Sequence, residues 1–145
     1  MQLKTIAILF LMLIPAGNIQ PVVANSEEVA NDPKTIVYYF HGNSRCRTCL
    51  TIEKYTRQAV NNGFADELEK GEMELRAVNV DLKENRHFIQ DYQLFSRSVV
   101  LSRQQDGKET AWKRLDRVWE LVGDESDFIS YIQDEIHEIR QCGRD

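Results

Sequence analysis

The sequence is short of cysteine and of proline. Only three of its 145 residues are cysteines, and no proline follows Pro33. An odd number of cysteines excludes a small exported scaffold that is held together by disulfides alone. Cys46 and Cys49 form one close pair and Cys142 lies far along the chain, which indicates a redox site and a bystander thiol.

Long apolar runs and clusters of basic residues are also missing from most of the chain. After residue 24 no stretch approaches the ~20 apolar residues of a membrane span, so we expect a soluble mature domain. The net charge is −5, and an acidic domain without basic patches is a poor partner for nucleic acid. No G-x-G-x-x-G pattern is present, so no flavin or nicotinamide cofactor is expected.

The first two dozen residues have the pattern of a secretory signal peptide. Lys4 is followed by an apolar run over residues 6–14, and a small-residue cleavage site ends at Ala24. We therefore expect residues 1–24 to be removed and the protein to be secreted or periplasmic. The apolar run is shorter than a typical transmembrane span. The alternative is an uncleaved N-terminal segment, which would then be the chain's membrane contact.

The rest of the chain divides into a polar, flexible lead-in over residues 25–34 and one domain over residues 35–145. Strands are expected at 35–40, 73–80, 98–102 and 110–115, and helices from about 47 to 62, at 85–92 and from 124 onward, with a further helical turn or two at 64–70. An Asp106-Gly107 turn joins the last two strands. Residues 118–122 fit the end of a strand or a loop equally well.

This order of elements predicts an α/β fold with three layers. A strand-helix-strand opening gives a parallel pair, a later hairpin adds an antiparallel edge, and helices cover the faces of the sheet. We therefore expect a central mixed sheet of about four strands flanked by helices. The last helix is the clearest element, because Asp124 can cap it and apolar residues recur at three- and four-residue steps after it.

The chemistry is expected at Cys46 and Cys49, which follow a strand and a turn and open a helix. Two cysteines three residues apart on a first helical turn face the same side and can close a disulfide. Free backbone N–H groups and the helix dipole favour a thiolate, so the pKa of Cys46 should lie below the usual value of about 8.5. Arg45, Arg47 and Thr48 flank this thiol as supporting residues. We predict that Cys46 attacks a disulfide and that Cys49 resolves the mixed disulfide.

Other interpretations of the cysteines have less support. A static disulfide across so short a loop adds little stability. A zinc site normally needs four ligands, and only Cys142 and the three histidines His41, His87 and His137 remain, without paired spacing, so no metal is expected. Cys142 continues the apolar stripe of the last helix and is expected to be a half-buried bystander. The alternatives are a second resolving thiol and a cysteine that forms an intermolecular disulfide. His41, on the turn before the pair, is either a proton shuttle or a loop residue without a role.

Three segments of the chain resemble the thioredoxin superfamily. They are the first strand with the cysteine pair (TIVYYFHGNSRCRTCLTIE, 35–53), the segment 77–96 (AVNVDLKENRHFIQDYQLFS) and the hairpin 99–109 (VVLSRQQDGKE). The likeness extends over residues 35–141. It implies a thioredoxin-like three-layer fold and an exchange of electrons with a partner protein through a mixed disulfide.

The sequence departs from the family at the positions around the cysteines. Arg45 stands where the family has tryptophan, and Arg47 and Thr48 replace its Gly-Pro between the cysteines. Ser98 stands where the family's cis-proline lies before the third strand, which implies more room beside the thiols. Phe40 occupies the likeliest position of the family's buried acid. These departures imply a less selective groove, or easier access for a metal or metalloid.

The run from Tyr38 to Cys49 (YYFHG…RCRTC) is also similar to small exported bacterial proteins, the ArsF-type subunit of a nitrophenyl-compound nitroreductase. This resemblance implies a redox subunit that serves a partner. We therefore expect an extracytoplasmic thiol-disulfide oxidoreductase or electron-transfer subunit that uses Cys46 and Cys49. The alternative is a thiolate-based carrier of a soft metal or metalloid. That alternative is supported if a third thiolate lies within reach, and Cys142 is the one candidate.

Overall fold

The structure is a computed structural model that describes residues 33–142. Its elements in chain order are β1 (Lys34–His41), α1 (Arg47–Gly63), α2 (Ala65–Glu69), β2 (Met73–Asn79), the 3₁₀ turn η1 (Lys83–Asn85), α3 (His87–Asp91), β3 (Ser98–Gln105), β4 (Lys108–Arg114), α4 (Val118–Leu121) and α5 (Glu125–Gln141). The predicted signal peptide lies outside the described residues. Within residues 33–142, no helix has both the length and the apolar composition needed to cross a membrane.

β1 lies inside the sheet because its sequence is apolar on both faces. Side chains alternate between the two sides of a strand. Val37 and Tyr39 therefore pack into one core cluster, whereas Ile36, Tyr38 and Phe40 pack into another on the opposite face. Each of these five side chains is at most 4% exposed. A strand buried on both faces must have a covering layer on each side.

The sheet is mixed and has the strand order β2-β1-β3-β4. β2 runs parallel to β1, β3 runs antiparallel to β1, and β4 returns antiparallel to β3. Asp106 and Gly107 make the turn between β3 and β4 with φ values of 53° and 71°. Two consecutive positive φ values are what a tight hairpin requires, and Asp-Gly adopts them readily. The predicted hairpin is therefore confirmed.

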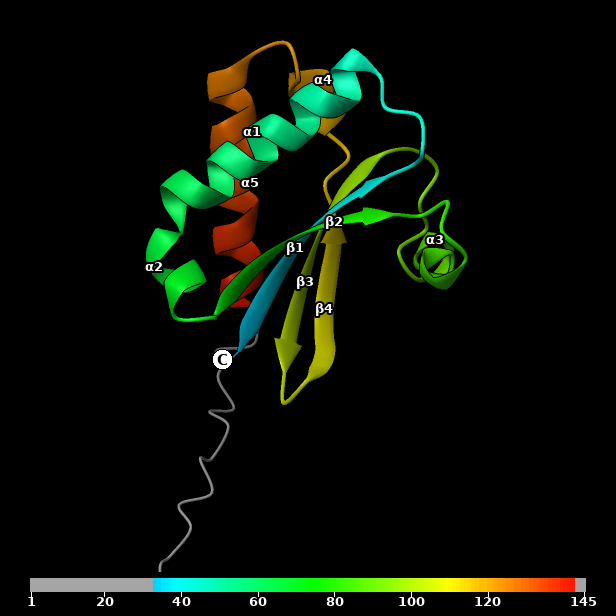
Figure 1. The fold of residues 1–145 in the computed structure, drawn as a ribbon. Coiled ribbons are helices and arrows are strands. Elements are labelled where there is room, and N and C mark those ends of the chain that lie inside the picture. The colour runs from blue at the N-terminus through cyan, green and yellow to red at the C-terminus, as the bar shows by residue number, and fades with distance from the viewer. Residues whose placement is uncertain (1–32, 143–145) are drawn as a thin grey trace, which may run out of the picture.

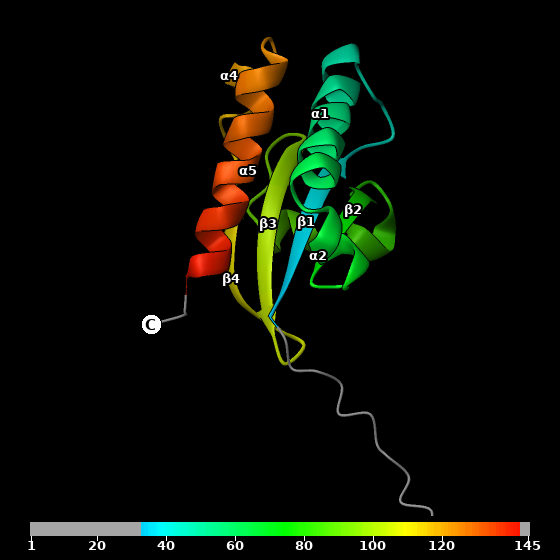
Figure 2. The same ribbon diagram turned by 90° about the vertical axis from the view of Figure 1, so that its left-hand side faces the viewer.

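Helices cover the sheet on both faces. α1 and α5 lie together on one face, while α3 lies on the other (Figures 1 and 2). α5 contributes buried residues at helical spacing, namely Phe128, Ile132, Ile136 and Ile139. Phe88 of α3 and the neighbouring Tyr92 pack against the opposite face of β1. The three layers confirm the predicted thioredoxin-like α/β fold with a four-stranded mixed sheet.

Two local expectations differ from the structure. Residues 118–121 form the short helix α4, in which Glu120 and Leu121 donate backbone hydrogen bonds to the Arg117 carbonyl. So short an apolar stretch does not distinguish a strand from a helical turn by periodicity. Cys142 is exposed, not half-buried. α5 ends at Gln141, and Cys142 turns away from the helix with φ −57° and ψ 117°, so the apolar stripe does not reach it.

Candidate functional site

The loop between β1 and α1 carries the cysteine pair, and hydrogen bonds hold it from two sides. Asp81, just beyond β2, accepts a hydrogen bond from the Asn43 N–H at 2.7 Å. The Asn79 side chain donates to Asn43 Oδ1, also at 2.7 Å. From the other side, Arg97 Nη2 donates to the Ser44 carbonyl at 2.9 Å. The segments that follow β2 and precede β3 therefore position the start of α1.

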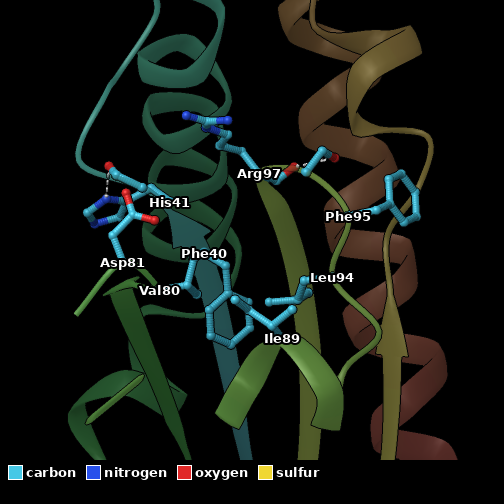
Figure 3. Close-up of a pocket in the computed structure, with 10 residues that line it drawn as sticks. Phe40, His41, Val80, Asp81, Ile89, Leu94, Phe95 and Arg97 are labelled. Atoms are coloured by element: carbon cyan, nitrogen blue, oxygen red, sulfur yellow. Dashed lines mark hydrogen bonds between the residues drawn. The ribbon is translucent and has the colours of Figure 1, made fainter. Parts of the chain in front are cut away.

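A pocket of about 200 Å³ opens beside this loop, where β1 ends. Apolar side chains that include Phe40, Val80 and Leu94 line its interior, and His41 and Arg97 lie at its polar margin (Figure 3). Arg97 belongs both to this pocket and to the loop contact with Ser44. The pocket therefore adjoins the segment that holds the cysteines.

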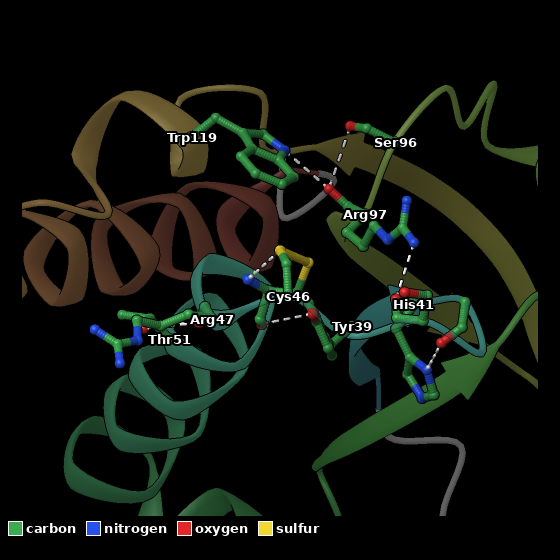
Figure 4. Close-up of a disulfide and its surroundings, with 11 residues drawn as sticks. Tyr39, His41, Cys46, Arg47, Thr51, Ser96, Arg97 and Trp119 are labelled. Carbon is green, nitrogen blue, oxygen red and sulfur yellow. Dashed lines mark hydrogen bonds between the residues drawn. A yellow bond between two sulfur atoms is a disulfide. The ribbon is translucent and has the colours of Figure 1, made fainter.

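Cys46 and Cys49 form a disulfide, with their Cα atoms 5.0 Å apart (Figure 4). Cys46 is the N-cap of α1, and its Sγ accepts a hydrogen bond from the Cys49 N–H at 3.1 Å. The first turn of α1 contains no acidic residue. The free N–H groups and the dipole of a helix start are positive, so negative charge on sulfur is stabilised there. The prediction that the pair opens a helix is confirmed.

The two cysteines differ in their exposure to solvent. Cys46 is exposed, whereas Cys49 is 2% exposed and lies in the core. A partner can therefore approach the sulfur of Cys46 and not that of Cys49. This difference is the arrangement that an attacking Cys46 and a resolving Cys49 require.

Tyr39 lies beneath the start of α1 and was missed by the sequence reasoning. Its hydroxyl donates a hydrogen bond to the Cys49 carbonyl at 2.7 Å. Burial raises the pKa of Tyr39 to about 12, partly opposed by the charge of Arg45. The assignment of Phe40 to the position near the resolving cysteine was wrong, because Phe40 points to the opposite face of the sheet. Strand alternation from Val37 was the signal that could have identified Tyr39.

The supporting residues next to the cysteines have different surroundings. Arg45 pairs with Glu53 at 2.7 Å and lies 5.9 Å from the centre of the Tyr39 ring. Arg47 is exposed, and Figure 4 shows its side chain on the outer side of α1, away from the sulfur atoms. Thr48 is half-buried in the first helical turn. Of the two arginines expected to add positive charge near Cys46, Arg45 is therefore paired with a carboxylate and Arg47 points away from the sulfur atoms.

His41 and Ser98 were predicted as supporting residues, and each side chain lies against a backbone carbonyl of its own segment. His41 is half-buried, its Nδ1 lies 3.0 Å from the Gly42 carbonyl, and its ring points away from the disulfide (Figure 4). Ser98 is the first residue of β3, and its hydroxyl donates to the Ser96 carbonyl at 3.0 Å. Neither side chain forms a hydrogen bond with a cysteine among residues 33–142. Their predicted participation in the site stays a prediction.

Trp119 is a second residue at the site that the sequence reasoning missed. Its Nε1–H donates to the Arg97 carbonyl at 2.9 Å, and its side chain is 39% exposed. Figure 4 shows Trp119 and Arg97 on the same side of the disulfide. The two residues come from the segments after β4 and before β3, so no local motif around Cys46 could reveal them. An exposed indole beside the disulfide provides an aromatic surface for a partner.

The structure gives no support to a third thiolate at this site. α5 ends at the opposite end of the sheet from the start of α1, and Cys142 lies there (Figures 1 and 2). The eight residues of β1 span about 26 Å between these two ends. Among residues 33–142, no group of three or more His, Cys, Asp or Glu side chains is placed to hold a metal ion.

Comparisons with known proteins found similar structures, but the sequence matches no protein-family model and no curated protein. A thioredoxin from Fasciola hepatica is 22% identical, with 72% of this chain and 83% of that chain covered and a TM-score of 0.42. A thioredoxin from Thermus thermophilus is 16% identical, with 77% and 85% covered and a TM-score of 0.38.

The strand order, the helix layers and the disulfide define the class of protein by themselves. The chain is a thioredoxin-like α/β domain with a Cys-x-x-Cys disulfide at the start of the helix that follows its first strand. Such a pair can open by accepting two electrons and close by giving them up. The arrangement therefore supports thiol-disulfide redox chemistry at Cys46 and Cys49.

Proposed function

We propose that this protein is an extracytoplasmic thiol-disulfide exchange protein that transfers electrons to or from a partner protein. The observation that carries the proposal is the pairing of an exposed Cys46 with a buried Cys49 at the start of α1. The exposed sulfur is the one that a partner reaches, and it lies where a thiolate is favoured.

The exchange proceeds in two steps that balance. In the reduced protein, the Cys46 thiolate attacks one sulfur of a partner disulfide, a new S–S bond forms, and the other partner sulfur leaves with the electron pair as a thiolate. Cys49, as a thiolate, then attacks Cys46. The Cys46–Cys49 disulfide forms and the second partner sulfur leaves. The protein loses two electrons and the partner gains them, and the reverse sequence oxidises a partner dithiol.

The setting of this chemistry is part of the proposal. The signal-peptide pattern over residues 1–24 supports export from the cytoplasm. The similarity of the run from Tyr38 to Cys49 to ArsF-type subunits supports a role as a redox subunit that serves an enzyme. We therefore expect a dedicated partner and not general disulfide reduction.

A test disulfide measures the proposed activity directly. The purified protein, reduced and freed of reductant, should reduce a disulfide-linked peptide dimer with the gain of one internal disulfide per chain. Cys46→Ser should abolish the reaction. Cys49→Ser should stop it at a covalent adduct with the peptide, visible by mass spectrometry.

Cys142→Ser is the matched control, because Cys142 is exposed and lies far from the pair. It should leave the reaction unchanged. Failure of the unsubstituted protein to exchange with the peptide in either direction would refute the proposed function. Loss of the reaction in Cys142→Ser would refute the assignment of the two roles to Cys46 and Cys49.

A further inference from the structure

Some cations within residues 33–142 pair with carboxylates, and others, among them Arg103 and Lys108, do not. At the far end, Lys34 and Arg76 both pair with Glu74, and Arg140 pairs with Glu67 and Glu72. At the disulfide, Arg47 and Arg97 form no ion pair within residues 33–142. An acidic protein thus has two cations without an ion-pair partner in the segments next to its exposed sulfur, Arg97 before β3 and Arg47 on the outer side of α1.

The acidic side chains near the loop have other partners. Glu53 pairs with Arg45 at 2.7 Å and with Arg57 at 2.8 Å. Asp81 accepts the hydrogen bond from the Asn43 N–H. Neither carboxylate forms an ion pair with Arg47 or Arg97 within residues 33–142. The Nε of Arg97 is also buried without a hydrogen-bond partner in the structure.

Arg47 and Arg97 lie on opposite sides of Cys46 (Figure 4). Arg97 is held by its bond to the Ser44 carbonyl, while Arg47 is an exposed side chain. A chain segment that delivers its own sulfur to Cys46 therefore has Arg97 on one side and Arg47 on the other. The first turn of α1 also lacks an acidic residue, so no carboxylate of that turn opposes the positive end of the helix.

We propose that the partner docks through an acidic segment, in which carboxylates flank the reactive cysteine and face Arg47 and Arg97. This inference rests on the proposed function, because it names the kind of partner that exchanges with Cys46. Opposite charge between two surfaces raises the rate of encounter and selects against basic partners. Trp119, beside Arg97 and 39% exposed, adds an aromatic surface to the same docking region.

Three peptides of equal length, one acidic, one neutral and one basic, test this selectivity. Each contains one cysteine, held in a mixed disulfide with 2-thiopyridine, and the flanking residues are glutamate, glutamine or lysine. In Cys49→Ser, the Cys46 thiolate attacks the peptide sulfur, the Cys46–peptide bond forms, and the other sulfur leaves with the electron pair as thiopyridone. Its absorbance gives the rate of this step alone. Each rate is divided by the rate of the same peptide with 2-mercaptoethanol, to remove differences in peptide reactivity.

We expect the acidic peptide to react about tenfold faster than the basic one at low salt. The neutral peptide should lie between them. The difference should shrink as salt rises, because a Debye length of about 8 Å at 0.15 M screens exposed charges. Equal normalised rates for the three peptides, or a fastest reaction with the basic peptide, would overturn the proposal.

Variants in the Cys49→Ser background locate the effect. Arg47→Glu should remove the advantage of the acidic peptide, and Arg47→Lys should keep it. Lys108→Glu changes the charge equally, but on an exposed residue at the hairpin end of the sheet, far from Cys46, and should keep the advantage. A slowing of all three peptides by one factor in Arg47→Glu would mean that the arginine acts on the thiol, and would overturn the docking proposal.

The two proposals fail in different ways in this experiment. Release of thiopyridone from no peptide would refute the proposed function, and the docking inference with it. Release at equal normalised rates would leave thiol-disulfide exchange in place and refute acidic docking alone.

Discussion

The two long helices of this protein begin in opposite ways. α1 and α5 each contain 17 residues, and in each a cap side chain accepts a hydrogen bond from the N–H three residues ahead. In α5 the cap is Asp124, and Glu125 and Asp127 add negative charge to the first turn. In α1 the cap is Cys46, and the first turn contains no acid. The start of α5 is neutralised, whereas the start of α1 is left positive.

The difference agrees with the proposed use of the start of α1. A carboxylate near a helix N-terminus typically stabilises the helix by about 0.3–1 kcal/mol. α1 forgoes that stabilisation and has sulfur, a weak hydrogen-bond acceptor, at its cap. The positive end is thereby kept for a thiolate that forms only when the disulfide opens. Giving the start of α1 the cap of α5 should therefore lower its reactivity and raise the stability of the helix.

The largest effect is expected when α1 receives the cap of α5. Cys46→Asp should abolish exchange with a peptide disulfide, because no sulfur remains at the exposed position. The same variant should be more stable than Cys46→Ala by about 1 kcal/mol, since aspartate is a good N-cap and alanine a poor one. Neither variant contains the disulfide, so urea unfolding of the pair isolates the cap.

Asp124→Ala provides the reciprocal control at the start of α5. It should lower the free energy of unfolding by about 1 kcal/mol, because the hydrogen bond from the Asp127 N–H is lost. It should leave the exchange rate unchanged. Equal stability of Cys46→Asp and Cys46→Ala would show that the two helix starts are not equivalent as caps.

Features of the two helix starts that depend on neighbouring residues can be predicted from the sequence. Contacts between residues far apart in the chain cannot. Cys46 at a helix start and Asp124 as a cap follow from a few neighbouring residues. Asp106-Gly107 likewise dictates its own turn. Arg97 reaches the site through a contact with Ser44, 53 residues away in the chain. Such a contact depends on how the strands order in the sheet, and periodicity within one segment does not contain that information.

At one position, the resemblance to the thioredoxin superfamily was a poorer guide than the alternation of side chains along the first strand. It placed Phe40 where a buried acid would lie near the resolving cysteine, but the alternation of side chains along β1 sends Tyr39 there. Alternation is a property of the backbone and survives a change of residue type. The hydrogen bond from the Tyr39 hydroxyl to the Cys49 carbonyl could not be predicted, because it depends on where α1 begins above the sheet.

An intermediate effect is expected from Tyr39, which supports the start of α1 from below. Tyr39→Phe removes the hydrogen bond to the Cys49 carbonyl and should lower the free energy of unfolding by about 1 kcal/mol. Chemical denaturation of the oxidised protein measures this loss. An unchanged unfolding midpoint would mean that the bond does not support the start of α1.

The same variant should change the stability of the protein at alkaline pH. Burial raises the pKa of Tyr39 from 10.0 to about 12, so the folded state favours the neutral phenol that donates to Cys49. That stabilisation is complete below pH 10 and is lost as the pH rises through about 12. The difference in unfolding free energy between the unsubstituted protein and Tyr39→Phe should therefore shrink over this range. A difference that grows with pH would contradict the raised pKa.

The smallest effect is expected when the first turn of α1 receives a charge like those of α5. Thr48→Asp places a carboxylate beside the thiolate without removing either sulfur. It should stabilise the helix start by a few tenths of a kcal/mol and destabilise the Cys46 thiolate. Exchange with a neutral peptide disulfide should slow by about two- to fivefold near neutral pH, the rate equivalent of about 0.3–1 kcal/mol. Thr48→Asn is the matched control of similar size, and it should exchange at the rate of the unsubstituted protein. A slowing in Thr48→Asn as large as that in Thr48→Asp would assign the effect to packing between the cysteines and not to charge. The absence of acidic residues from the first turn of α1 would then not explain the reactivity of Cys46.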